Sequence, residues 1–213
     1  MSLRKVDSTV GAISSRTRTR GRPREFDREE ALDKALHAFW RCGYETTSVA
    51  ALCTELGISP PSFYAAFVSK EALFIEAIQY YEEKYWTAAF RQLENPQRPL
   101  RDAVFEFFKN AAEFLADPSK PRGCMVVIAA TNLSNKEERI ASLMKSLRQG
   151  TRDVFRRRLE SAKKKGEFAG DPESTANALN IFLEGMSVQA RDGISREALL
   201  LAAKKVPLLL DLS

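Results

Sequence analysis

The chain has 213 residues, of which 44% are hydrophobic and 29% charged, and this composition is typical of a globular protein with one large or two small domains. The longest fully apolar run, 125-MVVIAA-130, is too short to cross a membrane and no apolar leader opens the chain, so we expect a cytoplasmic protein without a membrane partner. The net charge of +5 comes from residues 1–24, which carry seven Lys and Arg residues and a single acidic residue, Asp7. The rest of the chain holds 26 basic and 27 acidic residues. So basic a segment attracts polyanions.

Residues 1–25 are rich in Ser, Thr, Gly and Arg and almost free of apolar side chains, so we expect a flexible basic arm. From Asp27 nearly to the end, apolar residues recur at the i, i+3 and i+4 spacing of amphipathic helices. The sequence shows no alternating apolar and polar runs bounded by turns, and no repeat of fixed period. It therefore predicts an all-α fold.

Four helices are predicted in the first half of the chain. The first begins at 27-DREE-30, where Asp27 can cap the free amide groups, and it ends at Gly43. The other three are expected at about 46–57, 59–67 and 69–93. The stretch 95-NPQRP-99 then breaks the chain, because proline and asparagine favour turns over helix continuation.

Five further helices are predicted after this break, each bounded by proline, glycine or a capping residue. The first of them is rich in phenylalanine, the third ends at Gly166, and Asp171-Pro172 and Ser195 open the last two. Their expected ranges are about 99–116, 122–133, 136–165, 172–191 and 196–210.

The second and third helices have the size and spacing of a helix-turn-helix. Gly57 supplies the bend, Ile58 fills the angle between the helices, and Ser59 can cap the third helix. Pro60 and Pro61 follow at positions where backbone N–H groups have no partner within the helix, so two prolines cost little there. A residue before proline disfavours the helical region, so the helix could also begin at the second proline. So short a helix suits a DNA major groove about 12 Å wide.

Residues 27–75 resemble the DNA-binding domain of transcriptional regulators of the TetR/AcrR family. The resemblance rests on 43-GYETTS-48, 49-VAALCTELGIS-59, 63-FYAAF-67 and 69-SKEAL-73, and the rest of the chain matches in helical architecture and in short motifs such as 122-RGCMVV-127. It implies three parts. They are a basic arm over 1–25, a helix-turn-helix DNA-binding domain over 26–75 with the motif at about 47–67, and a helical effector-binding and dimerisation domain over 76–213.

The resemblance also implies which side chains meet DNA: hydroxyls and the helix start at the second helix for phosphate, the third helix for base edges, and Tyr64 and Lys70 for phosphate or base. The whole set is Thr47, Ser48, Ser59, Pro60, Pro61, Ser62, Tyr64, Ala66 and Lys70. Phe63 and Phe67 should turn inward. The third helix offers no Arg, Asn or Gln for bidentate readout, so discrimination should rest on Ser62, apolar contacts and DNA shape. Val68, where family members often carry glycine, lysine or proline, should be a tolerant surface site.

The basic arm could add what the third helix lacks. The stretch 20-RGRPR-24 is similar to an AT-hook, and its Arg20, Arg22 and Arg24 could enter the narrow minor groove of A·T-rich DNA. General attraction of a basic arm to phosphate is the alternative.

Apolar side chains of the second half could line an effector pocket or form a plain core. The pocket candidates are Phe105, Phe108, Cys124, Val127, Ile128, Phe155 and Phe182. The last two helices carry more apolar surface than a lone terminal pair needs, and in the resembled family this pair dimerises as a four-helix bundle. The dimer candidates are Leu179, Leu183, Met186, Leu199, Ala203 and Val206.

Three cysteines and a single histidine offer little for catalysis or metal binding. Cys42, Cys53 and Cys124 lack CxxC spacing, and His37 alone cannot build a site of several imidazoles, so no metal, cofactor or enzyme activity is predicted. Cys124 is a candidate redox or electrophile sensor, because its position at a helix start would lower the thiol pKa.

The sequence thus predicts a homodimeric DNA-binding transcriptional regulator, in the first place a repressor released by a small-molecule effector. Its two recognition helices would enter successive major grooves of a pseudo-palindromic operator in double-stranded DNA, about 34–36 Å apart or slightly more. Three alternatives remain open: activation in place of repression, a helical small-molecule binder or enzyme with a vestigial helix-turn-helix, and a thiol-based redox regulator.

Overall fold

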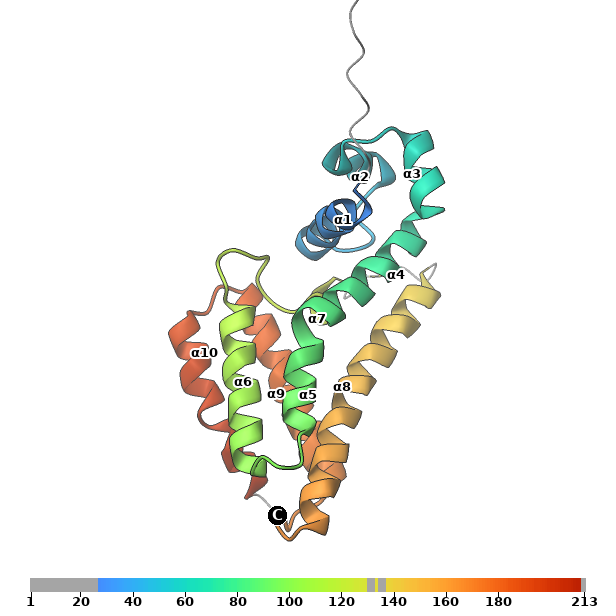
Figure 1. Ribbon diagram of the computed structural model, residues 1–213. Coiled ribbons are helices and arrows are strands. Elements are labelled where there is room, and N and C mark those ends of the chain that lie inside the picture. The colour runs from blue at the N-terminus through green and yellow to red at the C-terminus, as the bar shows by residue number, and fades with distance from the viewer. Residues whose placement is uncertain (1–26, 130–132, 134–136, 212–213) are drawn as a thin grey trace, which may run out of the picture.

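The computed structural model describes residues 27–129, 133 and 137–211. The described residues form helices and no strand, which confirms the predicted all-α class. Figure 1 shows α1, α2 and α3 clustered at one end of the molecule and the later helices running side by side at the other. The basic arm with Arg20, Arg22 and Arg24 lies outside the described residues.

The three-helix cluster forms as its capping residues predict. Its helices are α1 (Arg28–Cys42), α2 (Val49–Leu56) and α3 (Pro60–Phe67). The side chains of Asp27, Ser48 and Ser59 accept hydrogen bonds from the first free amides of α1, α2 and α3 respectively. Gly57 bends the chain between α2 and α3 at φ 68° and ψ 32°, a left-handed conformation that glycine adopts without strain. The third helix starts at Pro60, the first of the two prolines.

The predicted long fourth helix contains a π-helical turn that the sequence pattern did not indicate. α4 (Lys70–Tyr81) continues through the π-helix η1 (Glu82–Trp86) into α5 (Thr87–Glu94). A π turn adds one residue to a helical turn, and Figure 1 shows that the helix changes direction between α4 and α5. One end of this long element therefore packs in the three-helix cluster and the other end in the second part of the molecule.

Among the described residues, the second part of the chain is built from five helices and a 3-10 turn. They are α6 (Leu100–Leu115), α7 (Met125–Ile128), α8 (Glu138–Lys164), α9 (Pro172–Arg191), α10 (Arg196–Ala203) and the 3-10 helix η2 (Val206–Leu210). The helix predicted at 122–133 is wrong in length, because α7 has only four residues. The one predicted at 196–210 ends early. If α10 continued, the ring of Pro207 would clash with the carbonyl group four residues before it, at Ala203. The helix stops at that residue.

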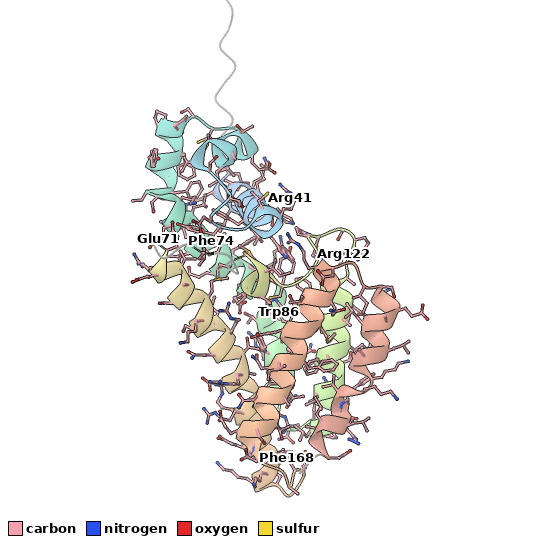
Figure 2. All side chains as sticks on the ribbon, turned by 180° about the vertical axis from the view of Figure 1, so that it is seen from behind. Arg41, Glu71, Phe74, Trp86, Arg122 and Phe168 are labelled. Atoms are coloured by element: carbon pink, nitrogen blue, oxygen red, sulfur yellow. The ribbon has the colours of Figure 1, made fainter. Side chains whose placement is uncertain are left out.

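An aromatic cluster joins the two parts of the molecule. The ring of Trp40 in α1 lies 5.0 Å from that of Tyr81, 5.9 Å from that of Tyr85 and 5.7 Å from that of Phe114, measured between centroids. Figure 2 shows the dense side-chain packing around this region, where Trp86 lies inside the molecule. Because α1, α4, η1 and α6 share these buried and half-buried rings, the packing resists independent movement of α1.

A short stretch, residues 123–129, also ties the two parts together, and we call it the clamp segment. The indole Nε1 of Trp40 donates to the Gly123 carbonyl at 2.9 Å, and the Tyr44 amide donates to the Ala129 carbonyl at 2.9 Å. Next to its first residue, the Cys124 amide donates to Ser187 Oγ at 2.7 Å. The two ends of the clamp segment thus hold the three-helix cluster, and Cys124 ties the segment to α9.

Candidate nucleic-acid interface and ligand pocket

One face of α3 is exposed on the surface of the molecule. Pro60, Pro61, Ser62 and Tyr64 are all exposed, and the Tyr64 ring retains 53% of its accessible surface. Phe63 and Phe67 turn into the core, with 0% and 1% exposure, as predicted. Because apolar anchors hold one side of this short helix, its other side presents a rigid surface of small and aromatic groups.

The exposed face includes Ala65, a residue that the sequence analysis missed. Ala66, the predicted contact, is half-buried and packs against the core, whereas Ala65 is exposed. Ala65 follows Pro61 by four residues and Ser62 by three, so helical periodicity places the three on one face. That periodicity was the signal available in the sequence, since Phe63 and Phe67 fix which face is buried. We therefore add Ala65 to the surface expected to meet base edges.

The hydroxyl groups at the helix starts are differently disposed. Ser48 is exposed, and its Oγ accepts from the Ala51 amide at 3.1 Å. Thr47 is only 4% exposed, and its Oγ1 donates to the Gly43 carbonyl at 2.6 Å. The Thr47 hydroxyl therefore holds the α1–α2 loop, and Ser48 is the better placed of the two for a phosphate.

Lys70, predicted to reach a phosphate, points inward. Its ammonium Nζ donates to the Tyr44 carbonyl at 3.1 Å and lies 4.1 Å from the centroid of the Tyr44 ring. Burial, followed by the nearby carboxylates of Glu137 and Glu71, raises the pKa of Tyr44 to about 12, so this ring stays neutral. In this arrangement Lys70 fixes the loop after α1, and a phosphate contact would require it to leave that place.

The connection from α3 to α4 passes through a strained residue. Val68 has φ 65° and ψ −50°, and the Ser69 amide donates to the Phe67 carbonyl across it, which makes a tight three-residue turn. A β-branched residue disfavours positive φ, at a cost of the order of 1–2 kcal/mol. The site is on the surface as expected, with 77% exposure, but it is conformationally demanding rather than tolerant.

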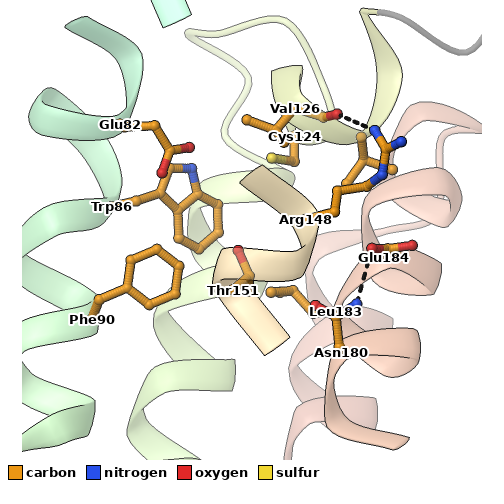
Figure 3. A pocket seen from close by; sticks show the side chains of 11 residues that line it. Glu82, Trp86, Phe90, Cys124, Val126, Arg148, Thr151, Asn180, Leu183 and Glu184 are labelled. Atoms are coloured by element: carbon orange, nitrogen blue, oxygen red, sulfur yellow. Dashed lines mark hydrogen bonds between the residues drawn. The ribbon is translucent and has the colours of Figure 1, made fainter. Parts of the chain in front are cut away.

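A small pocket lies between the π-helical turn, the clamp segment, α8 and α9 (Figure 3). Its volume is about 30 Å³, which is room for one or two water molecules. The lining residues are Glu82, Trp86 and Phe90 from η1 and α5, Cys124, Val126 and Val127 from the clamp segment, Arg148 and Thr151 from α8, and Asn180, Leu183 and Glu184 from α9. Its walls therefore mix aromatic and aliphatic surface with a few polar groups, as in small-molecule sites.

Only two of the seven predicted pocket residues, Cys124 and Val127, line this space. Phe108 instead packs within the core, 5.7 Å from Phe155 and 5.8 Å from Phe182 between ring centroids. Ile128 lines a different hollow beside the α1–α2 loop. Phe105 is partly exposed and lines neither space. Phe108, Phe155 and Phe182 thus belong to the core that supports the pocket.

The expectation that a helix start lowers the pKa of Cys124 is wrong. Burial raises the pKa of this thiol to about 11, and the Tyr81 hydroxyl, which donates to its Sγ at 3.3 Å, compensates only in part. The helix that begins after it has a single turn, so its dipole is weak. At neutral pH the thiolate is scarce, and this argues against a thiol-based redox regulator.

Glu82 is the most perturbed carboxyl group of the pocket. Burial raises its pKa from 4.5 to about 7, and no neighbouring charge contributes to the shift. Arg148, Glu184 and the thiol of Cys124 are the other ionisable groups around the pocket. The carboxyl group of Glu82 is therefore close to half-ionised at neutral pH.

We expect Glu82→Gln to stabilise the protein at about pH 8 by up to ~3 kcal/mol and to have little effect at about pH 5. Because the folded pKa of Glu82 lies above its unfolded value, folding favours the protonated form, and this contribution is lost as pH rises through about 7. Urea unfolding at both pH values, at one protein concentration, measures it. The exposed neighbour Glu83, changed to Gln, is the control; equal gains in the two variants would contradict the assignment.

The six predicted dimer residues are all buried within the single subunit. Leu179, Leu183, Met186, Leu199, Ala203 and Val206 have exposures of 0–7%. The apolar side chains that α9, α10 and η2 leave on the surface are Ile181, Val188, Leu201 and Leu208, with exposures of 47–70%. The six predicted residues therefore belong to the subunit core. Any partner subunit would contact the four exposed side chains instead.

None of the helices in the described part of the chain is long and apolar enough to span a membrane. Over the same residues, no group of three or more His, Cys, Asp or Glu side chains is placed to hold a metal ion.

Comparison with known proteins identifies the family. Residues 31–77 match the family model of bacterial regulatory proteins of the tetR family, and residues 101–204 match the tetracyclin repressor-like C-terminal domain. The chain belongs to the tetR family. This TetR-family chain is therefore a DNA-binding transcriptional regulator and not an enzyme. The family resemblance inferred from its helix-turn-helix is confirmed.

Two curated relatives illustrate the similarity. The HTH-type transcriptional repressor ComR of Escherichia coli (strain K12) is 34% identical over 185 residues, which cover 86% of this chain and 88% of the relative. The HTH-type transcriptional repressor BdcR of the same organism is 35% identical over 111 residues, covering 52% of this chain and 56% of the relative.

A solved structure extends the comparison to a DNA complex. A cysteine mutant of the TetR family transcriptional regulator CifR, complexed with 26bp double-strand operator DNA, superimposes with a TM-score of 0.82 at 35% identity and covers 88% of this chain and 98% of that one. The reduced form of Escherichia coli NemR, at 22% identity, 84% and 93% coverage and a TM-score of 0.71, shares the fold.

Proposed function

We propose that this TetR-family chain is a homodimeric repressor that leaves its operator when a small molecule binds the pocket beside the π-helical turn. The exposed face of α3, held from behind by Phe63 and Phe67, carries the proposal. It is supported by the name of ComR, a repressor, and by the operator complex of CifR. The basic arm over 1–25, the DNA-binding domain over 26–75 and the effector and dimer domain over 76–213 are the parts we assign to it.

The recognition surface in this proposal consists of Pro60, Pro61, Ser62, Tyr64 and Ala65. Ser62 supplies its only short hydroxyl, which lies 2.9 Å from that of Ser59 and can exchange that contact for a base edge. The prolines and Ala65 offer apolar contacts, such as to thymine methyl groups. Readout by this surface therefore depends on shape and methyl positions more than on bidentate hydrogen bonds.

Dimerisation is assigned to the outer apolar surface of the last helices. Ile181 and Val188 lie on α9, Leu201 on α10 and Leu208 on η2, and all four are exposed in the single chain. Packing this surface against its symmetry copy would make an isologous four-helix interface and place the two α3 helices for successive major grooves.

The pocket can act on α1–α3 through two routes. Glu82, Trp86 and Phe90 connect it to α4, whose start follows α3 directly. Cys124, in the clamp segment, lies next to Gly123, the acceptor for Trp40 of α1. An effector that binds better when these elements have shifted would stabilise a spacing of the α3 helices that does not fit the operator.

Titration of operator-sized genomic fragments by fluorescence anisotropy tests the proposal. We expect sequence-specific binding that weakens steeply with salt, about tenfold loss for Tyr64→Ala and a smaller loss for Tyr64→Phe, which keeps the ring but lacks the hydroxyl. The side chain of Tyr64 is 53% exposed, so neither change should alter the fold. Binding without any specific excess would instead favour a small-molecule binder with a vestigial helix-turn-helix.

Deletion of residues 1–24 is expected to lower operator affinity by tenfold or more and to flatten its salt dependence. Each phosphate contact that is lost reduces the slope of log affinity against log salt by about 0.9. A variant with Arg20, Arg22 and Arg24 changed to Lys keeps the charge and separates the two roles of the arm. Loss of a preference for A·T-rich flanks in that variant indicates minor-groove insertion, and an unchanged preference indicates general phosphate attraction. Full affinity after the deletion would show that the arm is dispensable.

A further inference from the structure

We propose that the pocket takes an organic ammonium ion with a short apolar group, and that the Glu82 carboxylate is its counter-ion. The inference rests on the proposed function and names the chemical class of its effector. It is carried by a partly buried carboxylate with no partner among the described residues, an aromatic wall beside it, and an excess of negative charge among the lining groups.

The carboxyl group of Glu82 has no partner in the described part of the chain. No described residue donates a hydrogen bond to the Glu82 carboxylate or forms an ion pair with it. The side chains of its neighbours Glu83 and Lys84, in contrast, both have partners. A carboxylate in so apolar a place is costly unless a cation or donors compensate it. Figure 3 shows the Glu82 side chain directed into the pocket from η1.

Aromatic surface lies next to this carboxylate. The rings of Trp86 and Phe90 are nearly parallel, 29° apart, with centroids at 5.9 Å, and both line the pocket. Such faces attract an ammonium group and also accept an apolar substituent. The Nε1 of Trp86, in a residue only 4% exposed, has no acceptor among the described residues. An ammonium group cannot accept this hydrogen bond, so a water molecule bound beside the ligand belongs at this wall.

The charge balance of the pocket favours a cation. Glu82 and Glu184 face Arg148 alone, so with both carboxyl groups ionised the lining carries a net charge of −1. Arg148 already donates to the Val126 carbonyl at 3.1 Å, and Glu184 already accepts from Asn180 at 3.0 Å. Of the three charged groups that line the pocket, Glu82 is therefore the one without a partner among the described residues. Two carboxylates would repel an anionic ligand, whereas an ammonium ion would neutralise the excess negative charge of the lining.

The present volume of about 30 Å³ requires the walls to move when such a ligand enters. Phe90 and Arg148 are only half-buried, so small shifts of these two side chains can enlarge the space while both still line it. The ammonium group would draw the Glu82 side chain toward the ligand, and that side chain belongs to the π-helical turn at the end of α4. Ligand charge and helix position are thereby linked at one residue.

Isothermal titration of the full chain with benzylamine and with benzyl alcohol, its neutral isostere, tests the inference. At about pH 8 we expect benzylamine to bind at least about tenfold more tightly, and Glu82→Gln to abolish the difference. The matched variant Glu83→Gln, one residue away and exposed, should keep it. Equal binding of the two compounds, binding of neither, or an undiminished preference in Glu82→Gln would overturn the proposal.

Proton release provides an independent reading. Because the pKa of Glu82 is about 7, binding of the ammonium ion at pH 7 should release about half a proton from the wild-type protein and none from Glu82→Gln. Titrations in two buffers of different ionisation enthalpy give this number, and zero release would count against Glu82 as the counter-ion. Operator binding by the wild-type protein without ligand is measured separately. A failed ligand test with intact operator binding rejects the ammonium ion and leaves the repressor proposal standing.

Discussion

Replacing Ile181 and Leu201 together by glutamate is expected to convert the protein into a monomer and to cut its operator affinity at least a hundredfold. The two side chains are 70% and 55% exposed in the single chain, so the charges do not enter the subunit core. In a symmetric dimer four apolar side chains would be lost. At about 1.5 kcal/mol each this sums to roughly 6 kcal/mol, or about four orders of magnitude in the dimer dissociation constant. Operator affinity falls because a monomer presents only one α3 helix.

Sedimentation equilibrium, with circular dichroism as a check of the fold, measures this effect. The matched control is Ile181→Leu with Leu201→Ile, which keeps both the volume and the apolar character and should remain dimeric. A dimer that survives the glutamate substitutions would show that this surface is not the interface. Charging the buried Leu183 would be uninformative, because it would unfold the subunit before testing any partner.

Gly123→Ala is expected to destabilise the protein by about 3 kcal/mol or more. The residue has φ 83°, and an added Cβ would lie 2.1 Å from Ile128 Cδ1 and 2.8 Å from the Ser187 carbonyl oxygen. The positive φ alone costs alanine about 1–2 kcal/mol, and the clash with the backbone of α9 adds to it, since a carbonyl cannot rotate away as a side chain can.

Gly166→Ala separates the two contributions. Gly166 has a similar φ of 74° but open space around the position of a Cβ, so its alanine variant should lose only about 1 kcal/mol. Urea unfolding of the two variants at equal protein concentration measures the difference. Equal losses would mean that the contact between the clamp segment and α9 is looser than the geometry indicates.

The helix-turn-helix could be predicted from the sequence almost residue by residue, because its ends are determined locally. Asp27, Ser48 and Ser59 cap the helices that follow them directly, and Gly57 bends within the same dozen residues. Even the two prolines follow a local rule about free amides. The sequence did not indicate contacts with distant partners: Lys70 turns toward Tyr44, 26 residues away, and no local pattern signals that contact.

The second half of the chain was harder to predict, because the apolar face of a helix does not indicate whether it packs in the subunit core or against a partner. Leu183 and Ile181 are both apolar residues of α9, yet the first lies in the subunit core and the second on the surface. The short α7 illustrates a related limit. The backbone groups at its start are hydrogen-bonded to Tyr81, Ser187 and Trp40, which are remote in sequence. The apolar run alone therefore predicted a longer helix.

The two carbonyls of the clamp segment have a thermodynamic consequence. Gly123 and Ala129 accept hydrogen bonds from Trp40 and Tyr44, and between them Cys124, Val126 and Val127 line the pocket. Any free energy by which an occupied pocket weakens DNA binding must equal the free energy by which bound DNA weakens occupation of the pocket. For the repressor we propose, many operator copies in a cell would therefore raise the effector concentration needed for release, so its sensitivity would depend on the number of its own binding sites.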